Sequence, residues 1–320
     1  MKRLTHYQAC LVLFASMGIS VGPLLHAASA AQHKAAAELL VQSVPPTDSS
    51  SSETPSSGSS VSDNSALAEG ISFVTRGDIK AAITAFERAV SEDPNSAQAH
   101  YNLGLALRQD QQLQSAASSF WRATQADPTF ALAYVNLGAA LLEGDNIEQS
   151  EGYLTRALEL DPELGLAHYN MGLLQHSKGE LEAALAAFNK AIAYTPSAPE
   201  PHYHVGLMYL EQGQYGPARQ ALENAIALDG AYAEAHYNLG VTFVRLGNLD
   251  AAISAFTQAF ENAPTFAHAY YAQGLALSDL QRYGEAITQL QTAINLYISQ
   301  DNSNWANIAQ RQIDYIESLQ

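Results

Sequence analysis

The chain has 320 residues, with 15 Lys or Arg against 32 Asp or Glu, so its formal net charge is −17 and its pI is about 4.8. This acidity argues against nucleic acid and anionic lipid as partners, because both bind through Lys and Arg. The single cysteine, Cys10, excludes an intrachain disulfide and a thiolate metal site.

The N-terminus has the pattern of a secretory signal peptide. Two basic residues precede an apolar run over 9–25, and small residues follow at Ala28 and Ala30. We expect residues 1–30 to direct export to the periplasm or out of the cell, with cleavage after Ala30. The alternative is an uncleaved helix that anchors the protein, because the apolar run is almost long enough to span a bilayer.

Residues 31–62 are predicted to form a flexible linker. The stretch from 42 to 62 is rich in Ser and Pro and has almost no large apolar side chains. Such a stretch cannot bury enough surface to offset the entropy of ordering it. We interpret it as a spacer rather than as a binding motif.

From Asp63 to Gln300 the sequence repeats with a period of 34 residues. The hexapeptide AHYNLG stands at 99–104 and again at 235–240, and AHYNMG stands at 167–172. A fixed period of this length is typical of a solenoid, in which each repeat is one supersecondary unit. The seven predicted repeats are 63–96, 97–130, 131–164, 165–198, 199–232, 233–266 and 267–300.

Each repeat is predicted to be a hairpin of two amphipathic helices, because apolar residues recur at intervals of three and four on both sides of a turn. Position 8 of every repeat is Gly and position 20 is Ala or Ser, which lets the two helices approach closely. Position 24 is Phe or Leu. Turn pairs such as Gly77–Asp78, and prolines such as Pro94 after the second helix, agree with these boundaries.

These spacings resemble the tetratricopeptide repeat, with Gly at position 8, Ala at 20, Phe at 24, Ala at 27 and Pro at 32. The resemblance covers about three quarters of the chain, which looks like an exported bacterial member of the family. It implies an all-α fold, an α-solenoid that winds helical hairpins into a right-handed superhelix.

Residues 301–320 are predicted to form a capping helix that closes the stack. A terminal repeat otherwise leaves its apolar face in water, so we expect capping rather than partner binding. The apolar face of this helix would carry Trp305, Ile308, Ala309, Ile313, Ile316 and Leu319.

Neither an enzyme nor a metal or other cofactor is expected. The chain has no catalytic motif and no phosphate-binding loop. The residues that most suggest a metal site are four histidines. They recur at position 4 of separate repeats and so cannot converge on one metal ion. They are His100, His168, His202 and His236.

In the family, positions 2, 5, 6, 9, 12 and 13 of each first helix line the concave side of the superhelix, and we call these positions the inner face. The resemblance implies that its tyrosines and asparagines contact an extended peptide. Asparagine amides can pair with both the N–H and the C=O of such a peptide. The alternatives are that the tyrosines pack between hairpins and that the asparagines bond within their own repeats. The candidate residues are Tyr101, Tyr169, Tyr203 and Tyr237 at position 5, and Asn102, Asn136, Asn170 and Asn238 at position 6.

We therefore expect an exported adaptor or scaffold that binds an extended segment of a partner protein. The inner face has almost no basic side chains, so the segment should be neutral or cationic and partly apolar. No nucleic acid is expected to bind, and the mature repeats are not expected to contact a membrane. The alternative is a self-assembling structural scaffold of the cell envelope.

Overall fold

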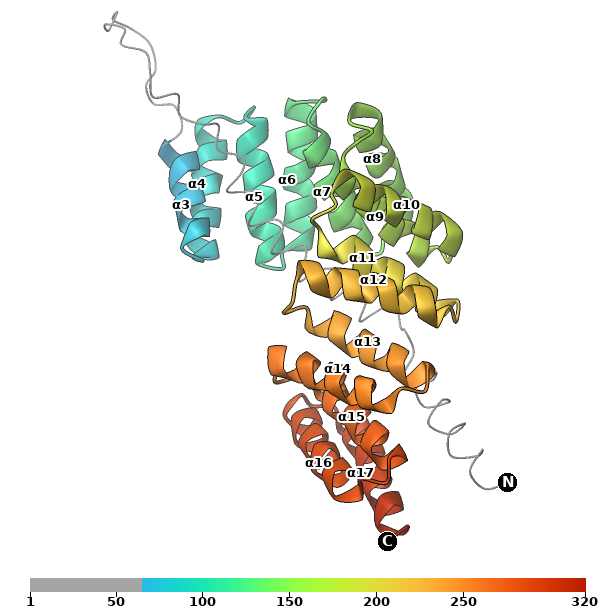
Figure 1. Cartoon of the computed structure of the whole chain (residues 1–320). Coiled ribbons are helices and arrows are strands. Elements are labelled where there is room, and N and C mark those ends of the chain that lie inside the picture. The colour runs from blue at the N-terminus through green and yellow to red at the C-terminus, as the bar shows by residue number, and fades with distance from the viewer. Residues whose placement is uncertain (1–64) are drawn as a thin grey trace, which may run out of the picture. The chain divides into compact units, whose positions relative to one another are not determined.

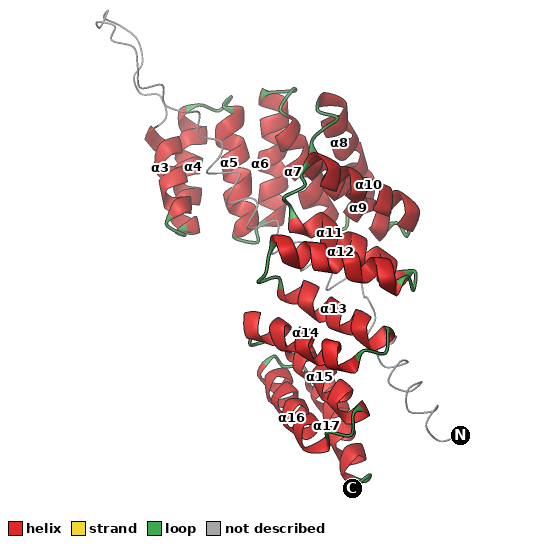
Figure 2. Ribbon diagram, viewed as in Figure 1, coloured by secondary structure: helices red, strands yellow, loops and turns green. Residues whose placement is uncertain are grey.

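The computed structural model describes residues 65–320, and every regular element in that range is a helix (Figure 1, Figure 2). The all-α prediction is therefore confirmed. The predicted signal peptide, residues 1–30, and the predicted linker, residues 31–62, lie outside the described residues. The described residues belong to two compact units, which we call the N-terminal block (65–194) and the C-terminal block (195–320).

The helices alternate as the first and second members of successive hairpins. The N-terminal block contains α3 (Ser65–Thr75), α4 (Ile79–Glu92), α5 (Ala97–Gln109), α6 (Leu113–Ala126), α7 (Ala131–Glu143), α8 (Ile147–Leu160), α9 (Gly165–Ser177) and α10 (Leu181–Tyr194). The C-terminal block contains α11 (Pro199–Glu211), α12 (Tyr215–Leu228), α13 (Ala233–Arg245), α14 (Leu249–Asn262), α15 (Ala267–Asp279), α16 (Tyr283–Ser299) and α17 (Ser303–Glu317).

The glycine at position 8 brings the two helices of each hairpin together. A Cβ atom at Gly104 would lie 2.6 Å from the ring of Phe120, the position-24 residue of the same repeat. In every repeat the side chain at position 24 occupies this place, and it is fully buried. The close approach predicted from position 8 is confirmed, and it explains a glycine inside a helix, where glycine costs about 1 kcal/mol relative to alanine.

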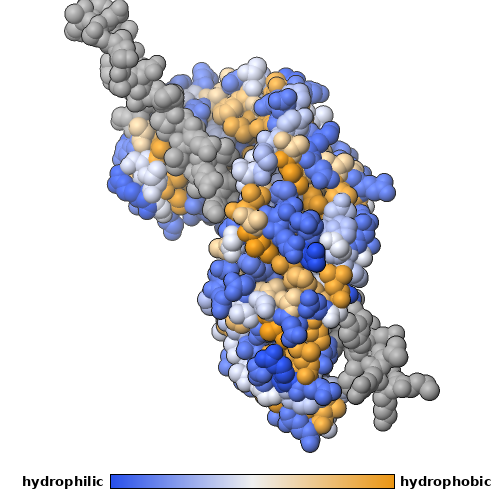
Figure 3. Space-filling model, viewed as in Figure 1, coloured by the Kyte–Doolittle hydropathy of each residue, from blue (hydrophilic) through white to orange (hydrophobic). Residues whose placement is uncertain are grey.

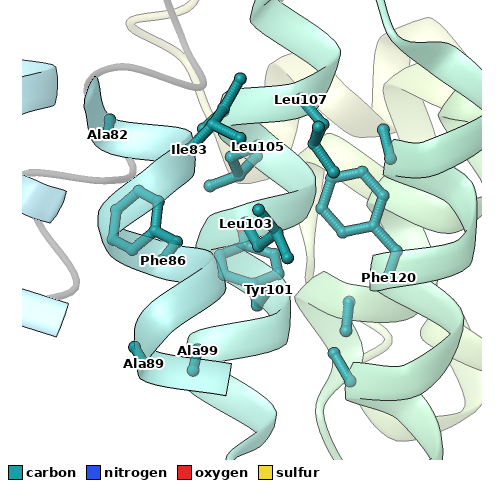
Figure 4. Packing of buried hydrophobic residues seen from close by; sticks show 14 of the residues in the cluster. Ala82, Ile83, Phe86, Ala89, Ala99, Tyr101, Leu103, Leu105, Leu107 and Phe120 are labelled. Carbon is teal, nitrogen blue, oxygen red and sulfur yellow. The ribbon is translucent and has the colours of Figure 1, made fainter. Parts of the chain in front are cut away.

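The core of the first repeats consists of residues from both helices of neighbouring hairpins. Figure 4 shows Phe86 of α4 beside Tyr101 and Leu105 of α5, with Phe120 reaching the same helix from α6. Each first helix packs on the second helix before it and on the second helix after it, as α5 does with α4 and α6. The apolar residues therefore form a continuous core through the first three repeats.

Two structural features recur in the turns, a positive φ after the first helix and an aspartate hydrogen bond after the second helix. Position 15, just after the first helix, has a positive φ in every repeat, and four of the seven residues there are glycines: Gly77, Gly179, Gly213 and Gly247. The other three, Gln111, Asp145 and Gln281, adopt the same conformation without being glycine. After the second helix, Asp93 accepts a hydrogen bond from the N–H of Asn95 at 3.0 Å, and three other repeats use an aspartate in the same way.

Two buried polar residues replace apolar ones at helix contacts and are hydrogen-bonded there. Gln273 stands where most repeats have Leu, Met or Val, and its Nε2 donates to the Ile253 carbonyl at 3.0 Å and to Thr257 Oγ1 at 2.7 Å. Ser150 stands in place of Ala at position 20 and donates to the Gly138 carbonyl at 2.7 Å. Both departures from the repeat pattern are therefore accommodated without an unsatisfied polar group.

The first repeat presents a polar surface where the second repeat is apolar. Glu69 and Ser72 occupy positions 7 and 10, which in repeat 2 are Leu103 and Ala106, both buried against α4 and its neighbours. Glu69 is exposed and forms an ion pair with Arg88 of α4. The polar side chains of this surface suit contact with water.

At the other end, α17 packs on α16 and buries Ala306, Ala309, Ile313 and Ile316. Its exposed face carries Gln310, Arg311, Asp314 and Glu317. The apolar face is smaller than predicted, because the helix ends at Glu317 and Leu319 is 44% exposed beyond it.

Candidate functional site

The first helices of neighbouring repeats contact one another within each block. In the N-terminal block α5 contacts α7 and α7 contacts α9, and in the C-terminal block α11 contacts α13 and α13 contacts α15. Inner-face residues of successive repeats are therefore neighbours along each block. The polar contacts on the inner face join one repeat to the next.

Two of the candidate asparagines link consecutive repeats. The Nδ2 atom of Asn136 donates to the hydroxyl of Tyr101 in the preceding repeat, at 3.2 Å, and to the carbonyl of Leu132 in its own helix, at 3.0 Å. Asn238 repeats the arrangement, donating to the Tyr203 hydroxyl at 3.2 Å and to the carbonyl of its own helix four residues before it at 2.9 Å. Position 5 of one repeat and position 6 of the next thus form a tyrosine–asparagine pair.

The other two asparagines have different surroundings. Asn170 is buried and donates to the Leu166 carbonyl at 2.8 Å. Asn102 accepts a hydrogen bond from Gln98 Nε2 at 2.9 Å, but its own Nδ2 is buried and has no hydrogen-bond partner within the described chain. The cause is the preceding repeat, because Leu67 stands at position 5 and offers no hydroxyl.

The candidate tyrosines pack mainly against aromatic rings of their own repeat. The Tyr101 ring lies 5.9 Å from that of Phe120 and 4.8 Å from that of Phe130. Burial raises the pKa of Tyr101, which the nearby charge of Arg108 partly offsets, and burial raises the pKa of Tyr237 to about 12. Tyr101, Tyr169 and Tyr203 are buried, whereas Tyr237 is half-buried. A contact between these residues and a ligand stays a prediction.

An ion pair on the inner face was not predicted from the sequence. Arg108 at position 12 of repeat 2 pairs with Glu143 at position 13 of repeat 3, and their side chains are only 3% and 12% exposed. Arg108 also donates to the Oδ1 atom of Asn136 at 3.4 Å. In the sequence, Arg108 and Glu143 are a cation and a carboxylate about one repeat apart. That spacing identifies an ion pair only when it is known that the first helices of neighbouring repeats are in contact.

Three of the position-4 histidines have one structural role. The Nε2 atom of His100 lies 3.0 Å from the Pro94 carbonyl oxygen, and the corresponding distances are 2.9 Å from His168 to Pro162 and 3.0 Å from His236 to the Gly230 carbonyl. Each histidine thereby ties a first helix to the turn before it. Among residues 65–320, no group of His, Cys, Asp or Glu side chains is arranged to hold a metal ion. In the same range, no helix combines the length and apolarity needed to cross a membrane.

Sequence profiles of the tetratricopeptide repeat cover most of the repeat region. Two profiles described as "Tetratricopeptide repeat" match residues 67–129 and 241–302, and residues 131–164. A third, described as "TPR repeat", matches 175–213 and 206–247. The matching profiles indicate no enzymatic family, and no curated protein matches the chain.

Solved structures with similar folds are also repeat proteins. The crystal structure of the APC/C hetero-tetramer Cut9–Hcn1 matches with a TM-score of 0.61 at 18% identity, over 74% of this chain and 48% of that one. PilW, described as a widely conserved type IV pilus biogenesis factor, matches with a TM-score of 0.58 at 21% identity, over 64% of this chain and 96% of that one. At these low sequence identities, the similarity to both structures supports the fold alone.

YrrB, described as a TPR protein with an unusual peptide-binding site, has a TM-score of 0.50 and is 26% identical. The match covers 61% of this chain and 99% of YrrB. The glycine-centred hairpins, the family profiles and these folds agree, and the chain belongs to the tetratricopeptide repeat family.

Proposed function

We propose that the protein is a non-enzymatic interaction module that binds an extended peptide segment of a partner protein on its inner face. The observation that carries the proposal is the row of aromatic and amide side chains that neighbouring first helices bring together within each block. Side chains of this kind bury apolar surface and pair with a peptide backbone at the same time. The similarity to YrrB, whose description includes a peptide-binding site, supports the same reading.

Asn102 differs from the other candidate asparagines because its Nδ2 has no acceptor within the described chain. The Nδ2 atoms of Asn136 and Asn238 already donate within the scaffold, whereas the Nδ2 of Asn102 has no such acceptor. A buried donor without a partner costs about 1–3 kcal/mol, and a peptide carbonyl would remove that cost. The other three asparagines act, on this proposal, mainly by positioning the inner face.

The polar ends of the array favour binding over self-assembly. End-to-end stacking would have to bury Glu69 at the start of the array, or the charged face of α17 at its end. Burying a charge is expensive unless a partner pairs with it. On the face shown in Figure 3, apolar patches are interrupted by polar residues, which is also typical of a protein that does not associate through a broad apolar surface.

Site-directed photo-crosslinking in cells tests the proposal. A photoreactive phenylalanine analogue is placed at Gln98 or Val241 on the inner face, and at the exposed Glu87 or Glu261 on second helices as matched controls. The expected result is one partner protein crosslinked from the inner positions, through a segment that binds as a synthetic peptide. Crosslinks confined to the second helices, or to a second copy of this chain, would refute it and support a self-assembling scaffold.

We also propose that the adaptor acts outside the cytoplasm. The proposal rests on the basic start, the apolar run over 9–25 and the small residues at Ala28 and Ala30. N-terminal sequencing of the protein purified from its own cells should give Ala31 as the first residue. A chain that still begins at Met1 would instead support the anchored form.

A further inference from the structure

The ion pair between Arg108 and Glu143 joins the first helices of repeats 2 and 3, and it is almost completely buried, with side chains that are 3% and 12% exposed. The guanidinium donates to the carboxylate twice, from Nε to Oε2 at 3.3 Å and from Nη2 to Oε1. Two parallel hydrogen bonds fix the relative orientation of the two groups as well as their distance. The pair therefore restricts how α7 can turn relative to α5.

The same two helices are joined a second time, two helical turns away. Tyr101 lies seven residues before Arg108 on α5, and this spacing places both on one face, about 10 Å apart along the helix. Asn136 and Glu143 have the same spacing on α7. Asn136 donates to the Tyr101 hydroxyl at 3.2 Å, and Arg108 Nη1 donates to Asn136 Oδ1 at 3.4 Å, so the two contacts are also linked to each other. Contacts at two separate points resist a rotation of α7 about either one.

The two contacts are combined at this repeat boundary alone among the boundaries within the described blocks. At the others, position 12 of the preceding repeat is apolar and cannot form an ion pair. These residues are Val74, Leu142, Leu210 and Val244. The boundary between repeats 5 and 6 has the tyrosine–asparagine pair of Tyr203 and Asn238 without the ion pair. Repeats of this chain therefore stack without a charge at position 12, and the ion pair must serve something other than stacking itself.

A buried ion pair contributes little net stability, because the attraction between its charges is offset by the cost of removing both from water. Apolar residues of similar volume often replace such a pair without loss of stability. Apolar contacts are not directional, however, whereas two parallel hydrogen bonds are satisfied in one orientation only. Arg108 and Glu143 should therefore act on the relative orientation of repeats 2 and 3.

We propose that Arg108 and Glu143 form a rigid joint that holds repeats 2 and 3 in one relative orientation. The joint fixes the shape of the inner face that α5 and α7 contribute to the N-terminal block. A preorganised surface loses less conformational freedom when it binds, so the joint should strengthen the binding of a partner segment. This consequence rests on the proposed function, whereas the joint itself does not.

Distances between two spin labels test the joint without a ligand. The labels are attached through Glu87→Cys on α4 and Lys190→Cys on α10, two exposed positions on either side of the joint. Cys10→Ser removes the single native cysteine. Double electron–electron resonance on the full chain should give one narrow distance distribution. The variant Arg108→Met/Glu143→Leu, in which apolar residues replace the joint, should give a broader one.

A second variant and a matched control locate the effect. Arg108→Lys keeps the charge but loses the two-bond geometry, so it should also broaden the distribution. The control Arg156→Met/Glu159→Leu makes the same replacements at an exposed ion pair of repeat 3 and should leave the distribution narrow.

Denaturation midpoints show whether the double variant broadens the distribution without unfolding. Glu143→Leu alone leaves the Arg108 guanidinium buried without its carboxylate, so the midpoint should fall. Adding Arg108→Met should restore most of it, because no unpaired charge then remains buried.

Photo-crosslinking in cells tests the consequence for binding. With Arg108→Met/Glu143→Leu, the yield of partner crosslinks from Gln98 on α5 should fall. The yield from Val241 on α13, in the C-terminal block, should change less, because α13 does not contain the joint.

The joint is refuted if Arg108→Met/Glu143→Leu and Arg108→Lys both leave the distance distribution as narrow as the control does. A broader distribution with unchanged crosslinking from Gln98 would support the joint and refute its role in binding. If the unchanged protein gave no crosslinks from its inner face, the proposed function would be refuted, and the spin-label distances would still decide the joint.

Discussion

The tyrosine–asparagine pairs predict that alanine substitutions of Asn136 and Asn102 lower the free energy of unfolding by different amounts. Both residues stand at position 6, so the sequence alone does not distinguish them. Asn136→Ala removes the hydrogen bonds that Nδ2 donates to the Tyr101 hydroxyl and to the Leu132 carbonyl. Each is worth about 1 kcal/mol net, and the buried Tyr101 hydroxyl loses its partner. We therefore expect Asn136→Ala to lower the free energy of unfolding by about 2–3 kcal/mol.

Asn102→Ala should lower the free energy of unfolding far less than Asn136→Ala, although Asn102 is buried and also stands at position 6. It removes one acceptor for the half-buried Gln98 and at the same time an Nδ2 that has no partner. The loss should stay within about 1 kcal/mol, because only the one hydrogen bond that Asn102 accepts is broken. Leu67→Tyr should have the opposite effect and stabilise repeats 1 and 2, because it supplies the missing hydroxyl.

Urea denaturation followed by circular dichroism measures the difference, and amide hydrogen exchange locates it. Since repeats contact only their neighbours, Asn136→Ala should raise exchange mainly in repeats 2 and 3. Equal denaturation midpoints for Asn102→Ala and Asn136→Ala would refute the reasoning, because they would mean that the two amides have equivalent surroundings in solution.

Three further predictions concern stability and are checked by denaturation midpoints. Gly104→Ala should destabilise the protein by about 1–3 kcal/mol, since its methyl group would overlap the Phe120 ring, whereas Gly152→Ala in α8 meets nothing within 4 Å and should stabilise it by up to about 1 kcal/mol. Gln281→Gly should stabilise it by about 1 kcal/mol, because Gln281 has a φ of 61° that glycine adopts without strain; a loss of stability would contradict this. Burial raises the pKa of Tyr237 to about 12 from 10.0, so the neutral phenol is favoured in the folded state. The stabilisation of the folded state by the neutral Tyr237 phenol is complete below about pH 10 and is lost as the pH rises to about 12. The Tyr237→Phe variant should therefore lose less stability between these pH values than the unchanged protein.

The hairpins could be predicted from the sequence because their determinants lie within one period. Gly104 and Phe120 are sixteen positions apart in the same repeat, and seven copies of that spacing reveal both the helices and their contact. The left-handed turn at Gln111 could not be predicted in the same way, because such a turn is usually marked by glycine and Gln111 adopts its φ of 62° without being glycine.

The inner face could be predicted as a list of positions but not as a set of contacts. The difference between Asn102 and Asn136 depends on the residue at position 5 of the preceding repeat, so it appears only once that cross-repeat pairing is known. Arg108 and Glu143 are likewise in different repeats, and nothing local to either residue identifies its partner. The predicted signal peptide and linker remain predictions.

The polar surface of the first repeat limits how this chain can lengthen in evolution. A repeat inserted ahead of it would have to cover Glu69 and Ser72 with the apolar side of its own second helix, leaving a carboxylate buried. A duplicate of an interior repeat presents residues such as Leu103 and Ala106 at those positions and fits between any two neighbours. Gain or loss of repeats should therefore occur inside the array, so the length of the inner face changes in steps of one repeat while the first repeat remains first.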